Sequence, residues 1–419
     1  MASAEQVVIT GLGVVSPLGN SREAVWESFR AGRSGVRSLE GFEAKNLPIR
    51  FGGEVRDFDP KAYVRPRKSL KVMSRDIQLA FAAAQMASED AGISPGAVDP
   101  ERLGVIFGAD MMYCDLEELE PAYRACYENG EFQESLWGER VMGELNPLWM
   151  LKYLPNMPAC HIGIAHDARG PSNSITLGEA SSLAALAESV RVLERGAADV
   201  MIVGGGSSRI HPMPLVVRTS RWLSQRNDDP AGACRPFELN RDGMVYGEGA
   251  GALILEPESR AVRRGARILA RIGSYAEQFG VGSNRATAIR QSLAASLRNA
   301  GVLPAELGFV SANGLSTREH DAIEAQAIRA ELNDKPTTAL KSYFGNLGAA
   351  AGAVELISCI LALDAGEVPR TLNYETPDPE CPVNVVHAKE PTAAGSSAVV
   401  MNQTTSGQAM AVVIRSPNA

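Results

Sequence analysis

The sequence lacks the residue patterns that build metal and disulfide sites. Its six cysteines contain no C-x-x-C pair and no Cys/His spacing typical of a metal ligand set. The five histidines are scattered along the chain, and no H-E-x-x-H motif occurs. We therefore expect reduced structural thiols, no metal site and no bound cofactor.

Long apolar runs and an excess of positive charge are also missing. No uninterrupted apolar run is long enough to cross a membrane. The start, MASAEQVVITGLGVVSPLG, lacks the basic region and long apolar stretch of a signal peptide. A cytoplasmic protein without a membrane partner is the expectation. The net charge of −8 gives no reason to expect nucleic-acid binding.

The chain is rich in short apolar runs that end in glycine turns. With 419 residues and 45% hydrophobic residues it is long enough for a large core. Strands and helices alternate, and this βαβ pattern predicts an α/β protein whose sheets are covered by helices. The pattern restarts after about residue 260. Expected strands cover 7–15, 199–206, 251–257 and 411–416, and expected helices cover 20–30, 74–91, 180–195, 322–332 and 349–365.

One predicted helix points to a buried polar site. Residues 180–195 carry alanine, leucine and valine on nearly every face, which is typical of a fully buried helix. Its N-terminus is then buried as well, and the unpaired N–H groups and helix dipole there meet whatever Glu179 presents. Such a place suits a thiolate or another anion. The alternative is a carboxylate near the surface, but a glutamate inside an apolar segment normally has a partner.

The whole chain resembles the β-ketoacyl-acyl-carrier-protein synthases of the thiolase superfamily. The resemblance rests on several motifs in the family's order. They are VVITGLGVVSPLGN, SRDIQLAFAAAQMASEDAGI, GPSNSI, ADVMIVGGGSS, CRPFELNRDGMVYGEGAGALILE, SANGLSTREHDAIEAQAI and LKSYFGNLGAAAGAVELI. It implies a thiolase-like five-layer α/β/α/β/α sandwich of two similar halves, expected at 1–257 and 258–419, in a usually dimeric protein.

Three positions depart from the family's Cys-His-His set. Where the family has its acyl-accepting cysteine, this chain has Glu179. The histidine of the family's H-G-T-S-T motif reads Asn313, and that of K-S-x-x-G-H reads Asn346. Lys341, Glu324 and Glu355 match the family pattern, and Lys341 completes the four expected catalytic positions.

The family's glycine loop near the C-terminus, with its gate phenylalanines, is also altered. This chain has QTTSGQA at 403–409 instead. The resemblance then places the substrate-binding residues at Thr404, Thr405 and Ser406.

These replacements remove the chemistry of condensation. A ketosynthase needs a soft nucleophile that is also a good leaving group, whereas a carboxylate attacking a thioester would give a high-energy anhydride. Asparagine can donate a hydrogen bond but cannot take a proton near neutral pH. We expect Glu179 to be buried and ionised at its helix N-terminus, with Lys341 or Asn313 and Asn346 as partners.

Three functions remain open. The chain is a non-condensing ketosynthase partner or acyl-binding subunit, as chain-length factors of type II polyketide systems are. Alternatively, it is an acyl-thioester enzyme with changed chemistry that uses Glu179 as a general base. The third is a structural protein without an acyl ligand.

Two surface features bear on partners. The segment YVRPRKSLKVMSR clusters Arg65, Arg67, Lys68, Lys71 and Arg75, and Arg218 with Arg221 form a second cluster. Such patches can steer an acidic acyl carrier protein despite the negative net charge, although a merely solvated face is the alternative. The apolar segment 144–166 is expected at a dimer contact or tunnel wall, in a homodimer or in a heterodimer with a catalytic ketosynthase.

Overall fold

The computed structural model describes residues 5–40, 44–217 and 222–418, and its centre is one mixed sheet of eleven strands. The strand order is β13-β12-β11-β14-β15-β10-β1-β9-β8-β4-β7. Within the described part of the chain, β1 pairs with β10 at two positions, Val8 with Arg271 and Ile9 with Ala270. The sheet therefore consists of an N-terminal and a C-terminal part joined by a short seam.

The N-terminal part is built from five strands, and the C-terminal part from six. The first five are β1 (Val7–Val15), β4 (Leu103–Ala109), β7 (Ser172–Ile175), β8 (Val200–Ser208) and β9 (Glu248–Pro257). The other six are β10 (Ala270–Phe279), β11 (Phe309–Ser311), β12 (Pro336–Thr338), β13 (Asn384–Val385), β14 (Ser397–Gln403) and β15 (Gln408–Arg415). Small ladders outside this sheet pair β2 (Val36–Ser38) with β3 (Phe51–Gly53) and β5 (Tyr127–Glu128) with β6 (Glu131–Phe132).

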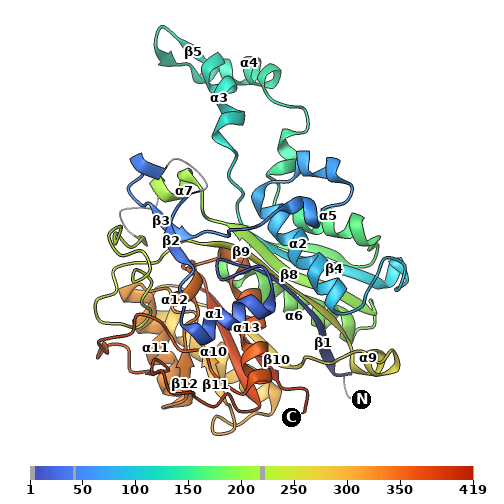
Figure 1. Ribbon diagram of the computed structural model, residues 1–419, viewed down its shortest axis with the longest axis vertical. Helices are drawn as coiled ribbons and strands as arrows, with labels where there is room; N and C mark the ends of the chain where they lie inside the picture. The colour runs from blue at the N-terminus through green and yellow to red at the C-terminus, as the bar shows by residue number, and fades with distance from the viewer. Residues whose placement is uncertain (1–4, 41–43, 218–221, 419) are drawn as a thin grey trace.

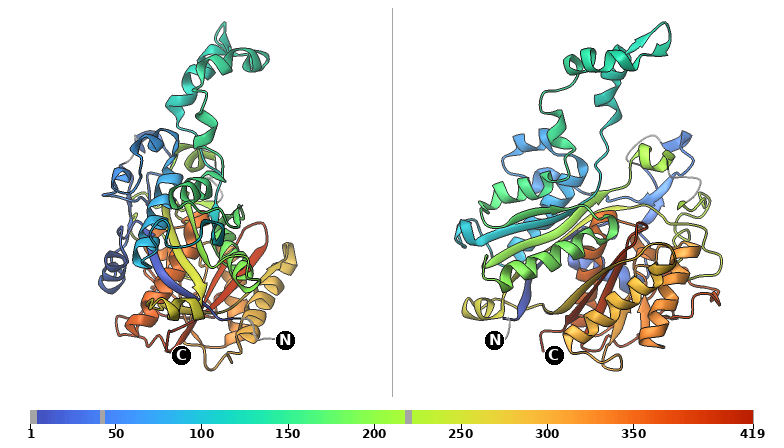
Figure 2. Two further views of the ribbon diagram at one scale, coloured as in Figure 1. Left: turned by 90° about the vertical axis from the view of Figure 1, so that its right-hand side faces the viewer. Right: turned by 180° about the vertical axis from the view of Figure 1, so that it is seen from behind.

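The helices and the two parts of the sheet form five layers (Figures 1 and 2). α2 (Arg75–Asp90) and α5 (Met157–His166) cover the outer face of the N-terminal part. α6 (Ser181–Glu194) and α13 (Ala351–Ala365) lie between the two parts. α10 (Arg285–Ala300) and α11 (Arg318–Leu332) cover the outer face of the C-terminal part. This is the sandwich that the sequence predicts.

The middle layer is apolar because both of its helices are enclosed on all sides. α13 is long and apolar enough to cross a membrane by length and composition, but 83% of the stretch Gly348–Ala365 is buried inside the protein. It packs with α6 in the main core cluster. The amide of Ala353 donates to Ser182 Oγ at 2.9 Å, so the N-terminal ends of the two central helices face each other. This contact fixes the place where the candidate site lies.

Glycine allows the outer helices to approach the sheet closely. A Cβ on Gly13 of β1 would lie 1.9 Å from the Ala83 carbonyl oxygen of α2, so no side chain fits there. Shorter helices connect or extend the layers: α1 (Arg22–Ala31), α7 (Pro212–Val217), α9 (Glu258–Arg263) and α12 (Lys341–Phe344).

An arm of residues 116–144 projects from the body (Figures 1 and 2). It contains α3 (Leu116–Ala125), β5, β6 and α4 (Trp137–Glu144). A small core of Ala122, Cys126 and Val141 holds it together.

The local elements agree with the sequence expectations. β1 has the expected bounds, and α6 begins at Ser181 after a single 3₁₀ turn at Gly178–Ala180. β9 ends at Pro257 and β10 begins at Ala270. The division into halves at 257 and 258 stays a prediction.

Candidate functional site

Three charged residues follow three parallel strands and meet at one edge of the sheet. β7, β4 and β8 are neighbours and run parallel. Asp110 comes directly after β4, Arg209 directly after β8, and Glu179 lies in the turn between β7 and α6. Because the carboxyl ends of parallel strands lie at the same edge, their side chains converge there.

Glu179 is buried, with 6% of its surface exposed, and one of its carboxylate oxygens accepts two hydrogen bonds. Its Oε1 accepts from Arg209 Nη1 at 2.6 Å and from Asn346 Nδ2 at 2.8 Å. Burial by itself would raise the pKa of Glu179. The Arg209 charge and the hydrogen bonds from Asn346 and Arg209 outweigh burial and lower this pKa to about 2. Glu179 is therefore ionised throughout the physiological range.

Arg209 is the residue that the sequence reading missed. Its Nε and Nη2 both donate to Asp110 Oδ2, at 3.0 and 2.7 Å, while Nη1 reaches Glu179. The guanidinium also lies over the Tyr246 ring, 5.5 Å from its centroid. Burial opposes its charge, but Asp110 and Glu179 outweigh that effect and raise its pKa. A sequence signal existed, because Arg209 is the first charged residue after the apolar strand that ends in GGGSS.

The expectation that Lys341 binds Glu179 is wrong. Its ammonium binds Glu355 at 2.6 Å and donates to Asn313 Oδ1 at 3.0 Å, and both side chains of the ion pair are almost fully buried. Lys341 has a carboxylate of its own, so Arg209 rather than Lys341 balances the charge of Glu179.

The two asparagines have different roles. Asn346 binds Glu179 as expected, and its Oδ1 accepts from the Gly348 amide at 3.1 Å. Asn313 does not bind Glu179, which corrects the other expected partner. Its side-chain Nδ2 donates to the Gln403 backbone carbonyl at 3.4 Å, and its backbone N–H donates to Glu324 Oε1 at 2.8 Å. Asn313 thus belongs with Lys341 to a second buried network beside the first.

A polar cavity of about 250 Å³ lies against Glu179. The turn at Thr404, Thr405 and Ser406 forms one wall, so the structure brings these predicted residues to the same cavity. The Thr404 hydroxyl is used within the turn, where it meets Ser406 Oγ at 2.9 Å and Gln408 Oε1 at 2.5 Å. Asp110, Glu179 and Arg209 also line the cavity and give it one net negative charge. A long apolar chain does not fit such a lining.

Comparison with known proteins decides the family. The N-terminal domain model of beta-ketoacyl synthases matches residues 4–261, and the C-terminal domain model matches residues 270–375. The chain belongs to the beta-ketoacyl synthase family. It is similar to a 3-oxoacyl-[acyl-carrier-protein] synthase 2 of Synechocystis sp., with 32% identity over 398 residues that cover 91% of each chain.

Two solved ketosynthase structures share the fold over nearly the whole length. The ishigamide ketosynthase/chain length factor aligns with a TM-score of 0.85 and 26% identity, covering 99% of this chain and 100% of that one. A type II PKS acyl-carrier protein in complex with its ketosynthase bound to the hexaketide (AntDE:AntF) aligns with a TM-score of 0.82 and 28% identity, covering 99% and 100%. These likenesses confirm the predicted ketosynthase architecture.

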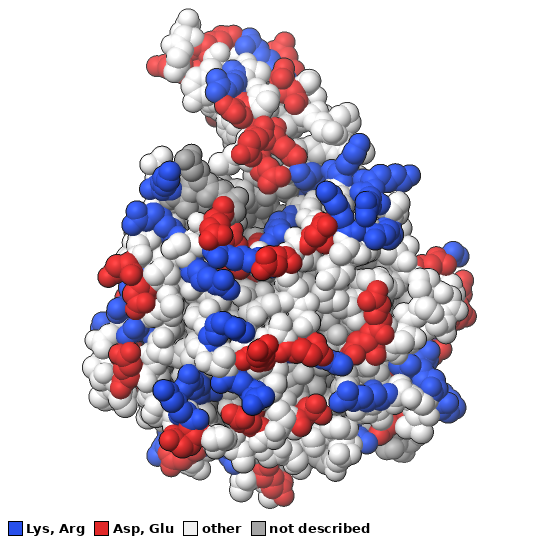
Figure 3. Space-filling view, viewed as in Figure 1, with Lys and Arg blue, Asp and Glu red and all other residues white. Residues whose placement is uncertain are grey.

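The basic segment around residues 65–71 of this chain lies on the surface. Its four predicted carrier-binding residues, Arg65, Arg67, Lys68 and Lys71, are all exposed, and Figure 3 shows Lys and Arg gathered on the body below the arm. Arg75 does not belong to this patch, because it forms an ion pair with the buried Glu248 at 2.8 Å. The second predicted cluster, Arg218 and Arg221, lies outside the described residues.

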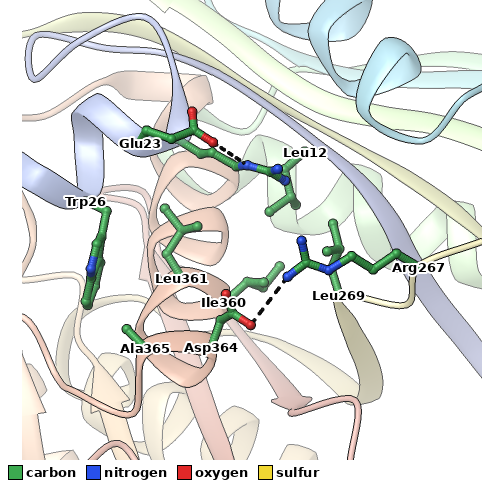
Figure 4. A pocket seen from close by; sticks show the side chains of 10 residues that line it. Leu12, Glu23, Trp26, Arg267, Leu269, Ile360, Leu361, Asp364 and Ala365 are labelled. Atoms are coloured by element: carbon green, nitrogen blue, oxygen red, sulfur yellow. Dashed lines mark hydrogen bonds and ion pairs between the residues drawn. The ribbon is translucent and has the colours of Figure 1, made fainter.

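A second cavity, of about 290 Å³, lies away from this site between α1, α13 and the start of β10 (Figure 4). Trp26 forms part of its apolar wall. Its charged groups pair with each other, Arg22 with Glu23 at 2.8 Å and Arg267 with Asp364 at 3.6 Å. The cavity therefore presents no unbalanced charge to a ligand.

Proposed function

We propose that this chain is a non-condensing ketosynthase subunit that works as the partner of a catalytic ketosynthase in fatty acid or polyketide biosynthesis. One observation carries the proposal. At the position where the family resemblance places the acyl-accepting cysteine, Glu179 is committed to Arg209 and Asn346. A carboxylate with a pKa of about 2 is a weak nucleophile and forms no stable acyl intermediate.

The same observation argues against Glu179 as a general base. An efficient base has a pKa near the working pH, so that it can take up a proton in the transition state. With a pKa of about 2, Glu179 holds protons far too weakly at neutral pH. The acyl-binding version of the proposal is weakened as well, because the cavity beside Glu179 is small and polar. The partner role is the function that these features favour.

Two exposed regions support a dimer. Among the described residues β7 pairs only with β4 and ends the sheet, so its other edge is open to a strand of a second subunit. Ile164 of α5, a helix that contacts β7, is 80% exposed, and Met142 on the projecting arm is 77% exposed. An open sheet edge and exposed large apolar side chains are features of a surface that another chain covers. We infer a second chain of the same fold as the occupant, in line with the similarity to the ishigamide ketosynthase/chain length factor.

The basic patch gives the subunit a contact for an acidic carrier protein. Residues 60–75 carry no carboxylate, whereas Arg65, Arg67, Lys68 and Lys71 are exposed in that segment. A local positive field of this kind raises the association rate of an acidic partner although the whole chain is negative.

The decisive experiment is a condensation assay with the purified single chain and acyl- and malonyl-carrier substrates. We expect no β-ketoacyl product. Glu179→Cys should at most accept an acyl group, since Arg209 remains to favour the thiolate. Elongation should require Asn313→His and Asn346→His in addition, and the same triple variant with Ser at position 179 is the matched control. Clear product from the wild-type chain, freed of any other ketosynthase, would refute the proposal.

A co-purification experiment tests the partner role. Tagged chain expressed with a cysteine-containing ketosynthase should retain it through size exclusion at a ratio of one to one. Exclusive self-association in the presence of that ketosynthase would count against a heterodimer.

A further inference from the structure

The projecting arm of residues 116–144 is strongly acidic (Figure 3). It contains eight glutamates, two arginines and no aspartate or lysine, which gives it a net charge of −6. Three of the glutamates form ion pairs: Glu118 with Lys152, Glu120 with Arg124 and Glu128 with Arg140. The other five are exposed and make no ion pair among the described residues: Glu117, Glu131, Glu134, Glu139 and Glu144.

The arm buries little apolar surface of its own. Its core has three buried residues, and the rings around it stay partly open to solvent. Tyr123 contacts Trp137, with 4.9 Å between ring centroids, yet Tyr123 is 47% exposed, Tyr127 is 53% exposed and Met142 is 77% exposed. Units this small rarely bury enough surface to stabilise themselves, and exposed apolar side chains of this size are typical of a protein contact.

The opposite charge is found in residues 60–75 of the same chain. This segment has six lysines and arginines and no carboxylate, a net charge of +6. Arg75 is neutralised by Glu248. The other five are exposed and make no ion pair among the described residues: Lys61, Arg65, Arg67, Lys68 and Lys71. The arm and the segment therefore carry complementary charges that their own surroundings leave largely unpaired.

Within one chain these two surfaces do not pair. Among the described residues, no hydrogen bond or ion pair joins 116–144 to 60–75. The arm is connected to the body through residues 110–115 and 145–148, and its far end, with β5 and α4, points away from the body (Figures 1 and 2). The carboxylates near that end, Glu131, Glu134 and Glu139, are thus presented to another molecule.

We propose that the arm of one copy of this chain docks its carboxylates on the basic segment 61–71 of a second copy. A twofold axis gives two such contacts in a dimer, because each copy supplies one arm and one basic segment. A single exposed ion pair stabilises little, but two sets of unpaired opposite charges steer and orient the chains that carry them. The contact also covers the exposed apolar side chains of the arm. This inference does not rest on the non-condensing role.

An arm bound in this way competes with the acidic carrier protein proposed above for the same basic residues. The two proposals are nevertheless tested separately. Charge reversal on the arm leaves the basic segment intact, so carrier binding by such a variant still reports on the carrier contact alone.

The first test cross-links the wild-type chain with a carbodiimide, which joins a carboxylate to a lysine amine in contact with it. Isotope-labelled and unlabelled protein are mixed until native mass spectrometry finds both forms in the same assemblies. We expect arm peptides joined to peptides with Lys68 or Lys71, with one of the two labelled, because such pairs come from two molecules. Links within one isotope form only would place the arm on its own chain and overturn the proposal, as would the absence of links between the two segments.

The second test reverses the charges of each surface. The arm variant carries Glu131→Lys, Glu134→Lys and Glu139→Lys, and the segment variant carries Arg67→Glu, Lys68→Glu and Lys71→Glu. In sedimentation at low salt, each variant alone should self-associate at least about tenfold more weakly than the wild type, because like charges now face each other. An equal mixture of the two variants should regain the wild-type association, because both arm contacts again join opposite charges.

The matched control makes the same charge change at three exposed glutamates of the body: Glu27→Lys, Glu375→Lys and Glu390→Lys. It should associate as the wild type does. Salt at about 0.5 M should weaken the wild-type association and reduce the difference between the wild type and the two variants. Equal association of the arm variant and the control would overturn the proposal, and so would a mixture that associates no better than either variant alone. Neither result would bear on pairing at the β7 edge.

Discussion

Replacing Glu179 by alanine should destabilise the protein, because the carboxylate is a structural element of the buried charge cluster. In the folded protein the pKa of this group is lowered from 4.5 to about 2. Each pKa unit corresponds to about 1.4 kcal/mol, so the ionised form contributes on the order of 3 kcal/mol at neutral pH. The substitution also strands the Asn346 donor, whereas Arg209 keeps Asp110. A loss of about 3 kcal/mol is therefore the expectation.

Thermal melts of the wild type and Glu179→Ala measure this loss. For a chain of this length the loss corresponds to a fall in the melting temperature of about 3 °C. Glu194→Ala is the control, because Glu194 is exposed at the end of the same helix. An unshifted melting temperature for Glu179→Ala would refute the structural role. It would favour a Glu179 that faces an open cavity and does not stabilise the fold.

The pH dependence gives a second check with a definite sign. The folded pKa of Glu179 lies below its unfolded value, so the contribution is complete above about pH 5. It is lost as the pH falls from about 4.5 towards about 2. Denaturant unfolding should show a constant gap between wild type and variant from pH 8 to pH 5, and a smaller gap below. A gap that grows on acidification would contradict the lowered pKa.

Three further predictions follow from the same structure. Arg209→Met leaves Asp110 and Glu179 without their cation and should lower the free energy of unfolding in urea at pH 7 by about 3–5 kcal/mol. The loss should be smaller at lower pH, where the carboxylates take up protons. Arg195→Met, at an exposed arginine, should have little effect. Light scattering at micromolar concentration should find a dimer, and a uniform monomer would contradict the proposed use of the β7 edge. Arg67→Glu should weaken acyl-carrier binding by about tenfold at low salt, whereas Arg298→Glu, at another exposed arginine, should not. Equal binding by both variants would contradict the role of the basic patch.

The fold could be predicted from the sequence because its signals are local. Apolar runs that end in glycine turns set the bounds of β1 and the position of α6, and the helix that is apolar all round is enclosed between the two parts of the sheet. The motif order then predicted the ketosynthase family, and the burial of Glu179 followed from a carboxylate placed at the start of a buried helix.

The partners of Glu179 were decided only by the tertiary structure. Arg209 is 30 residues further along the chain and Asn346 is 167 residues further, and both reach the carboxylate because separate strand and helix ends meet at one edge of the sheet. Lys341 was the expected cation, but Glu355 on the facing helix takes its charge at 2.6 Å. Sequence patterns fix which face of an element is buried, whereas the choice between two nearby cations depends on distances of a few ångströms between elements. Coulomb energies in a buried site change steeply over such distances, so only the assembled fold settles which charges pair.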